Sequence, residues 1–214
     1  MKKDYKPSSL HALPLGLGAG LVFALLWVAL SLLVLAPTPE PALPALALPP
    51  EPSPTPGFAE LDPLTKLHIT GTAQTIDLAA FRLSVQGRVR HPLSLTYDEL
   101  RRLPRLTTRD PIICKGYFED YAHWAGASLL AVLDRAGAAP EATKLVLISA
   151  DGYESQVSME EARSGRAFLA YEWEGRALPR LHGYPLRAAF PGLPGNRWVK
   201  WLVGLRVEGP DSGS

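Results

Sequence analysis

The sequence is poor in cysteine and carries almost no excess charge. Cys114 is the one cysteine among 214 residues. The chain alone therefore cannot form an intramolecular disulfide or ligate an iron–sulfur cluster, and it has no Cys-x-x-Cys-His motif for haem attachment. A formal net charge of +1 gives no electrostatic reason to expect nucleic-acid binding. An internal repeat and the Gly-rich loop of a dinucleotide-binding fold are also missing, which argues against a repeat protein and a nicotinamide enzyme.

A long apolar run lies near the N-terminus. Residues 15–35 carry no charge, and Ser31 is their only clearly polar member. As a helix this run would be about 31 Å long, which matches a hydrocarbon core of roughly 30 Å. It is longer than the apolar region of a cleaved signal peptide, about 7 to 15 residues, which is the alternative interpretation. The sequence therefore predicts a transmembrane helix over residues 15–35.

The charges around this run predict its orientation. Three lysines lie within residues 1–14, whereas the charges that follow the run are first acidic. The positive-inside rule then places residues 1–14 in the cytoplasm and the rest of the chain outside it. Nine of the 21 prolines fall between Pro37 and Pro56. Because this composition favours extended polyproline conformations, we expect residues 36–75 to form a stiff linker and extended segment.

The remaining sequence alternates between short strand and helix signals. Apolar and polar residues alternate from Phe81 to Gln86, and Leu145–Ile148 is an apolar run suited to an interior strand. Thr96 and Glu99 have capping-box spacing, and a helical face that includes Leu129 and Leu133 ends at Gly137. These patterns predict one α+β domain with a mixed sheet over residues 76–209, followed by a short tail, 210–214.

Two groups of residues could carry chemistry. The first is Cys114, which follows Ile112 and Ile113 at the end of a predicted strand and precedes an aromatic-rich loop. Taken alone it could be an inert buried thiol, but a thiolate at a strand end is well placed to bind a soft metal centre. The second group contains His182, Arg187 and Lys200, whose cationic or hydrogen-bonding side chains could together receive a phosphate.

Several motifs make the sequence resemble the sulfite oxidase family of molybdopterin enzymes. They are LAYEWEGRALPRLHGYPLR from Leu169 to Arg187, WVKW from Trp198, and the order of FRLSVQG from Phe81, Cys114 and WAG from Trp124. The resemblance covers about residues 78 to 208 and implies the sulfite-oxidase-type molybdopterin-binding fold. It also implies a molybdenum–molybdopterin cofactor.

The resemblance further implies roles for individual residues. Cys114 would be the thiolate ligand of molybdenum, and Tyr153 would lie beside the substrate. The positions expected to hold the pterin and its phosphate are Asp151, His182, Arg187, Trp198, Val199 and Lys200. Asp151 is equally well explained as part of an Asp-Gly turn.

The sequence also departs from the family pattern. Glu119 occupies the position, five residues after the ligand cysteine, where sulfite oxidases carry an anion-binding arginine. Because a carboxylate there should repel sulfite, we expect another substrate and an activity closer to that of sulfoxide-reducing relatives. Leu61–Asp77 shows no recognisable version of the cofactor-binding segment that precedes the core in larger members, and the N-terminal lysines do not form a twin-arginine signal.

The leading hypothesis is a membrane-anchored oxidoreductase that transfers an oxygen atom to or from a small-molecule substrate. Its electrons would be exchanged with an external electron-transfer protein or a membrane redox partner. The main alternative is a non-catalytic, membrane-anchored binding module that keeps the fold without the cofactor. A cysteine hydrolase with His123 as its base is a third hypothesis.

Overall fold

The computed structural model describes residues 60–210. These residues belong to one of two compact units of the chain, the one that runs from Leu43 to Ser214. The predicted transmembrane helix, the N-terminal residues before it, most of the proline-rich linker and most of the tail lie outside the described residues. Within residues 60–210, no helix combines the length and the apolar character needed to cross a membrane.

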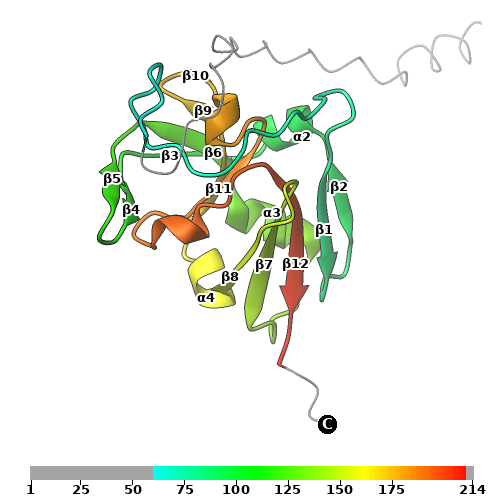
Figure 1. Ribbon diagram of the computed structural model, residues 1–214. Helices are drawn as coiled ribbons and strands as arrows, with labels where there is room; N and C mark the ends of the chain where they lie inside the picture. The colour runs from blue at the N-terminus through cyan, green and yellow to red at the C-terminus, as the bar shows by residue number, and fades with distance from the viewer. Residues whose placement is uncertain (1–59, 211–214) are drawn as a thin grey trace, which may run out of the picture. The chain divides into compact units, whose positions relative to one another are not determined.

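The first sheet contains five strands in the order β2-β1-β12-β7-β8. Their bounds are β1 Leu83–Gly87, β2 Leu93–Leu95, β7 Lys144–Ser149, β8 Glu154–Ser158 and β12 Leu202–Glu208. Strands β1 and β12 run parallel, and the other neighbours are antiparallel. The mixed sheet predicted from the sequence is thus present, with the C-terminal strand β12 at its centre (Figure 1).

A second, antiparallel sheet has the order β10-β9-β6-β3, and β11 also pairs with β9. Its strands are β3 Arg105–Thr108, β6 Trp124–Ser128, β9 Phe168–Trp173, β10 Arg176–Ala177 and β11 Arg187–Ala189. A separate hairpin joins β4, Ile112–Cys114, to β5, Phe118–Asp120. The aromatic-rich loop expected after Cys114 is therefore a tight turn, with Phe118 on a strand.

The helices are short and start at side-chain caps. They are α2 Tyr97–Arg101, α3 Leu129–Ala136 and α4 Met159–Ala162, with 3-10 turns η1 Arg180–His182 and η2 Gly195–Arg197. Thr96 forms the predicted capping box with Glu99. Gly137 ends α3 in the left-handed conformation, which glycine adopts without steric cost. Both helix predictions are confirmed.

One hydrophobic core joins the two sheets and α3. Side chains from both sheets pack together, and Trp124 and Leu145 are fully buried within them. In the predicted run Leu145–Ile148 on β7, Leu145 to Leu147 are buried and Ile148 is half-buried, as expected for an interior strand. At about 25 cal/mol for each Å² of apolar surface removed from water, this burial is the main stabilising term.

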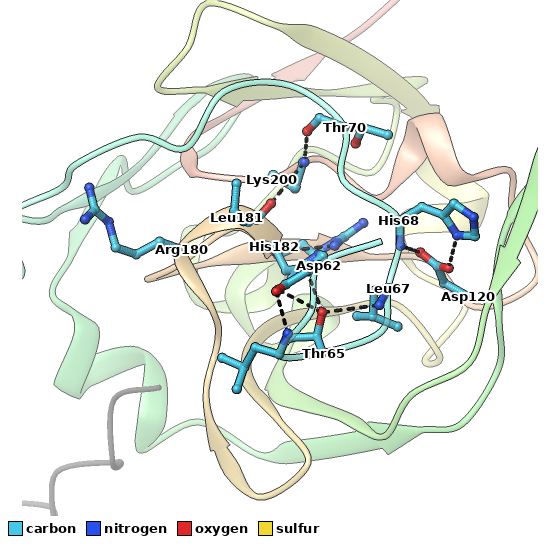
Figure 2. Close-up of polar contacts among 12 residues, drawn as sticks. Asp62, Thr65, Leu67, His68, Thr70, Asp120, Arg180, Leu181, His182 and Lys200 are labelled. Atoms are coloured by element: carbon cyan, nitrogen blue, oxygen red, sulfur yellow. Dashed lines mark hydrogen bonds and ion pairs between the residues drawn. The ribbon is translucent and has the colours of Figure 1, made fainter. Parts of the chain in front are cut away.

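The packed chain begins before the predicted domain boundary at Ile76. Leu67 and Ile69 are almost completely buried, and Leu61 pairs with His68 in a small antiparallel bridge. The backbone turns at Lys66, whose φ of 61° lies in the left-handed region. We call residues 60–71 the N-terminal strap; Figure 2 shows that it passes close to His182 and Lys200.

Candidate functional site

The β4–β5 hairpin presents one face to a pocket and the other to solvent. Cys114 pairs directly with Phe118, and Ile112 pairs with Asp120. Directly paired strand residues project to the same side of a sheet, and residues two apart share that side. All four side chains therefore line the same pocket. Glu119 lies on the opposite face.

The pocket has a volume of about 340 Å³ and gathers all the predicted site residues. They are Cys114, Asp151, Tyr153, His182, Arg187, Trp198, Val199 and Lys200. They come from β4, η1, β11, the loop after β7, and the segment between η2 and β12. The fold thus brings together positions that are far apart in the sequence.

Cys114 is half-buried and lies against Gly195. Burial of the thiol raises its pKa, the nearby Asp120 carboxylate raises it further, and Arg187 acts in the opposite direction. The free thiol is therefore protonated at neutral pH. A bound metal ion would displace that proton, because metal ligation requires the thiolate.

Arg187 is a buried cation that forms no ion pair with a carboxylate of residues 60–210. Its side chain is only 6% exposed, and its Nη1 donates a hydrogen bond to the carbonyl of His182 at 3.2 Å. The guanidinium lies 5.1 Å from the ring centre of Trp124 and 5.9 Å from that of Trp198. Burial lowers the Arg187 pKa to about 10, so the group remains charged at neutral pH.

Lys200 is the second cation of the pocket. Its Nζ donates hydrogen bonds to the carbonyls of Thr70 and Leu181, and it lies 4.6 Å from the ring centre of Trp201. Burial, together with the charge of Arg187, lowers the Lys200 pKa to about 7. Among the described residues, the ion pairs involve neither Arg187 nor Lys200. Arg187, and Lys200 when it is protonated, therefore offer positive charge to an anion bound in the pocket.

His182 is held by two side chains of the N-terminal strap (Figure 2). Its Nε2 lies 3.0 Å from Oδ2 of Asp62 and 2.9 Å from the hydroxyl oxygen of Thr65. Burial raises the Asp62 pKa, but hydrogen bonds from His182, the Leu64 amide and Thr65 outweigh it and lower that pKa to about 2. Burial also lowers the His182 pKa, so a neutral imidazole donates to an ionised carboxylate.

A second residue of the strap, His68, pairs with Asp120 of β5. His68 Nδ1 lies 2.7 Å from Oδ1 of Asp120, and the His68 amide donates to Oδ2 at 2.9 Å (Figure 2). Both residues line the pocket, as do Leu67, Thr70 and Gly71 of the strap. Leu61–Asp77 has no recognisable cofactor-binding motif in its sequence. In the structure, however, part of this stretch forms a wall of the site.

Asp151 and Tyr153 lie at the rim. The Asp151 carboxylate accepts a hydrogen bond from the Tyr153 amide at 3.0 Å, which is the geometry of an Asp-Gly turn. Tyr153 is 46% exposed, and its hydroxyl donates to the carbonyl of Asn196 at 3.2 Å. Both interpretations of Asp151 are compatible with the structure, because the turn residue also lines the pocket.

Glu119 and His123 both lie outside the pocket. Glu119 is exposed and bound by the Tyr121 hydroxyl, so its charge does not face the Cys114 thiol. On the β4–β5 hairpin, the carboxylate that faces the pocket is Asp120. His123 lines a separate hollow with Arg109 and Glu174, so it is not placed to act as a base for Cys114.

The chain is similar to known proteins of one family. Residues 70–214 match the family described as "Oxidoreductase molybdopterin binding domain". The chain is 28% identical over 141 residues to the "Uncharacterized oxidoreductase YuiH" of Bacillus subtilis, which covers 65% of this chain and 71% of that relative. It is 30% identical over 167 residues to the mitochondrial sulfite oxidase of Rattus norvegicus, covering 64% of this chain and 31% of that enzyme.

Two further similarities involve a reductase subunit and a solved structure. The chain is 29% identical over 132 residues to the "Putative protein-methionine-sulfoxide reductase subunit YedZ1" of Azospira oryzae, covering 62% of this chain and 50% of that one. The sulfane dehydrogenase SoxCD of Paracoccus pantotrophus has a similar fold, with a TM-score of 0.63 at 24% identity over 81% of this chain and 55% of that one. The matched regions are thus about half or less of the sulfite oxidase and reductase-subunit relatives.

Proposed function

The chain belongs to the family of oxidoreductases with a molybdopterin binding domain, and from this premise we propose that it transfers an oxygen atom at the Cys114 pocket. The family is that of sulfite oxidase, and its cofactor is molybdenum–molybdopterin. The observation that carries the proposal is the meeting of one thiol, the buried Arg187 and the partly buried Lys200 in a single pocket.

The residues of the pocket fit this cofactor. Arg187 Nε and Trp198 Nε1 are buried and have no hydrogen-bond partner among the described residues. Such orphaned donors are rare in native proteins and point to a missing acceptor. The pterin phosphate would supply acceptor oxygens and neutralise Arg187 and Lys200. Cys114 would supply the soft thiolate that molybdenum accepts.

When bound, the cofactor would supply the two-electron redox change, and the protein would supply binding, orientation and electrostatics. Cys114 would hold the metal. His182, Arg187 and Lys200 would hold the pterin phosphate, with Trp198 and Val199 beside them. Asp151 would contact the pterin from the rim, and Tyr153 would lie beside the substrate.

We propose a neutral oxygen-bearing substrate, such as a sulfoxide, rather than sulfite. Asp120 is 6% exposed and lies on the same hairpin face as Cys114. Its carboxylate would repel an anion placed above the thiol. One relative is named as a putative protein-methionine-sulfoxide reductase subunit, which is consistent with this substrate class.

The electron partner and the membrane anchor also belong to the proposal. A chain with one cysteine cannot carry an iron–sulfur relay of its own, so electrons must come from an external electron-transfer protein or a membrane redox partner. The apolar run 15–35 would hold the chain in the membrane as a single pass, with residues 1–14 in the cytoplasm and the oxidoreductase domain outside it.

Metal and pterin analysis of the full chain tests the function. The protein would be purified from the native membrane fraction or from a host that makes the cofactor. We expect stoichiometric molybdenum and pterin, and turnover of methionine sulfoxide with reduced methyl viologen as the electron donor. Folded protein without molybdenum would refute the proposal and favour the non-catalytic binding module.

A further inference from the structure

The His68–Asp120 pair has the geometry of an oriented acid–base group. Asp120 contacts His68 twice, once at the ring Nδ1 and once at the backbone amide. The ring also stacks on Phe118, with 4.2 Å between ring centres and 9° between ring planes. These contacts fix the imidazole in both position and plane. A histidine oriented by a carboxylate is a recurring arrangement for proton transfer.

The same contacts determine which ring nitrogen is free. Because Nδ1 faces the carboxylate, it carries the hydrogen and donates it to Asp120. Nε2 is then the ring nitrogen that Asp120 leaves free. The His68 side chain is 23% exposed, so solvent can replace that proton.

His68 lies close to the expected reaction centre without being bound to it. It stacks on Phe118, and Phe118 is the direct cross-strand partner of Cys114. All three residues line one pocket. His68 and Cys114 thus share the pocket in which the proposed function places the substrate.

Three other titratable side chains of the pocket, those of His182, Lys200 and Tyr153, are held by contacts. His182 directs Nε2 to Asp62 and Thr65. Lys200 donates to two carbonyls, and the Tyr153 hydroxyl donates to the Asn196 carbonyl. Among the described pocket residues, His68 therefore combines solvent access with a ring nitrogen that no contact holds.

We infer that His68 is a catalytic proton-transfer residue and that Asp120 is its positioning residue, which rests on the proposed function. Reduction of a substrate XO follows XO + 2 H⁺ + 2 e⁻ → X + H₂O, with the electrons supplied by the external electron-transfer protein. His68 takes a proton at Nε2 from solvent and passes it to the oxygen that leaves as water, once for each proton. In the oxidative direction, His68 accepts protons from water.

Steady-state kinetics of the full-length holoenzyme test this role. The assay uses methionine sulfoxide with reduced methyl viologen, and the variants are His68→Gln and a matched control, His123→Gln. We expect His68→Gln to lower kcat by about 100-fold or more, with KM and molybdenum content changed little, because general acid–base catalysis contributes about 10² to 10⁴. His123→Gln should behave as the wild type. Added imidazole should restore part of the activity of His68→Ala.

A measurement on the cofactor-free protein is independent of turnover. Nitrogen-15 NMR of labelled histidine should show His68 with its hydrogen on Nδ1, and Asp120→Asn should shift that signal. A hydrogen on Nε2 in the neutral ring would overturn the inference.

The kinetic outcomes separate this inference from the proposed function. If His68→Gln retains full wild-type activity, the role of His68 is overturned and the proposed function stands. Loss of molybdenum from His68→Gln would also overturn it, because His68 would then retain the cofactor rather than transfer protons. Molybdenum-loaded wild type that does not reduce the substrate would overturn the proposed function, and the inference with it.

Discussion

Gly195 lies directly against the thiol of Cys114. A side-chain carbon at position 195 would come within 2.8 Å of Sγ of Cys114 and within 3.1 Å of Cγ2 of Ile112. The backbone of Gly195 is not in the left-handed region, so close approach rather than conformation requires glycine here. The first residue of η2 therefore determines where the thiol sits.

Gly195→Ala should displace the thiol and lower the molybdenum content of the purified protein several-fold. The added methyl group would press on Sγ, so the thiol must rotate away or the turn must move. Molybdenum analysis checks this, with Arg197→Ala in the same turn as the control. Full molybdenum occupancy in Gly195→Ala would show that the thiol is not the ligand or that the turn adjusts freely.

Cys114→Ser should abolish turnover while leaving the fold intact. Serine has nearly the same shape, and the site is only half-buried, so the thermal midpoint should change little. X-ray absorption at the molybdenum edge should show one sulfur neighbour fewer, if any metal is retained. An active Cys114→Ser protein would argue against the ligand role.

Arg187→Met should remove the cofactor without unfolding the domain. A buried charge that has no carboxylate partner contributes little net stability, and replacing buried charges by apolar groups is often neutral or stabilising. We expect the free energy of unfolding of the cofactor-free protein to fall by less than about 1 kcal/mol. Arg105→Met, which removes an exposed ion pair with Glu172, is the control and should retain molybdenum.

Asp62→Asn should weaken the domain at neutral pH but not in strong acid. The Asp62 pKa is lowered from 3.8 to about 2, so the ionised carboxylate stabilises the folded state above about pH 4. This contribution is about 2 kcal/mol and is lost as pH falls from about 4 to about 2. Urea unfolding at several pH values measures it, and exposed Asp134→Asn is the control. If the difference in unfolding free energy between wild type and Asp62→Asn does not shrink in acid, the low pKa of Asp62 is contradicted.

Lys200 should make the cofactor-free protein more stable as pH rises. Its pKa is lowered to about 7, so between about pH 7 and 10 the unfolded chain binds a proton that the folded chain does not. Stability relative to Lys200→Met should therefore increase across this range. The expected change is about 1 kcal/mol per pH unit, equivalent to a thermal midpoint shift of about 2 to 4 °C. If the stability difference between wild type and Lys200→Met is the same at every pH in this range, Lys200 does not lose its proton.

Several local elements were predictable because their causes lie within a few residues. The capping box of Thr96 and Glu99 and the glycine stop at Gly137 act over one or two turns of chain. The apolar run on β7 likewise identifies a buried strand. The grouping of Cys114 with His182, Arg187 and Lys200 came from the family resemblance, and the pocket confirms that these residues meet.

The N-terminal strap was not predictable in this way. Asp62 meets His182 across 120 residues of sequence, and His68 meets Asp120 across 52. No local periodicity encodes contacts at such separations. The proline-rich composition upstream of the strap suggested a linker that would continue to residue 75, whereas Leu67 and Ile69 are buried.

Three features can be identified without the fold. Cys114 is the one thiol of the chain, residues 15–35 are apolar enough for a membrane span, and the later motifs are those of a molybdopterin-binding oxidoreductase. Which carboxylate faces the thiol, in contrast, depends on the fold. Successive strand residues point to opposite sides, so the register of β5 against β4 puts Asp120 in the pocket and Glu119 outside it. Because Asp120 rather than Glu119 lies on the inner face of the hairpin, its carboxylate can bind the His68 ring and hold it at the site.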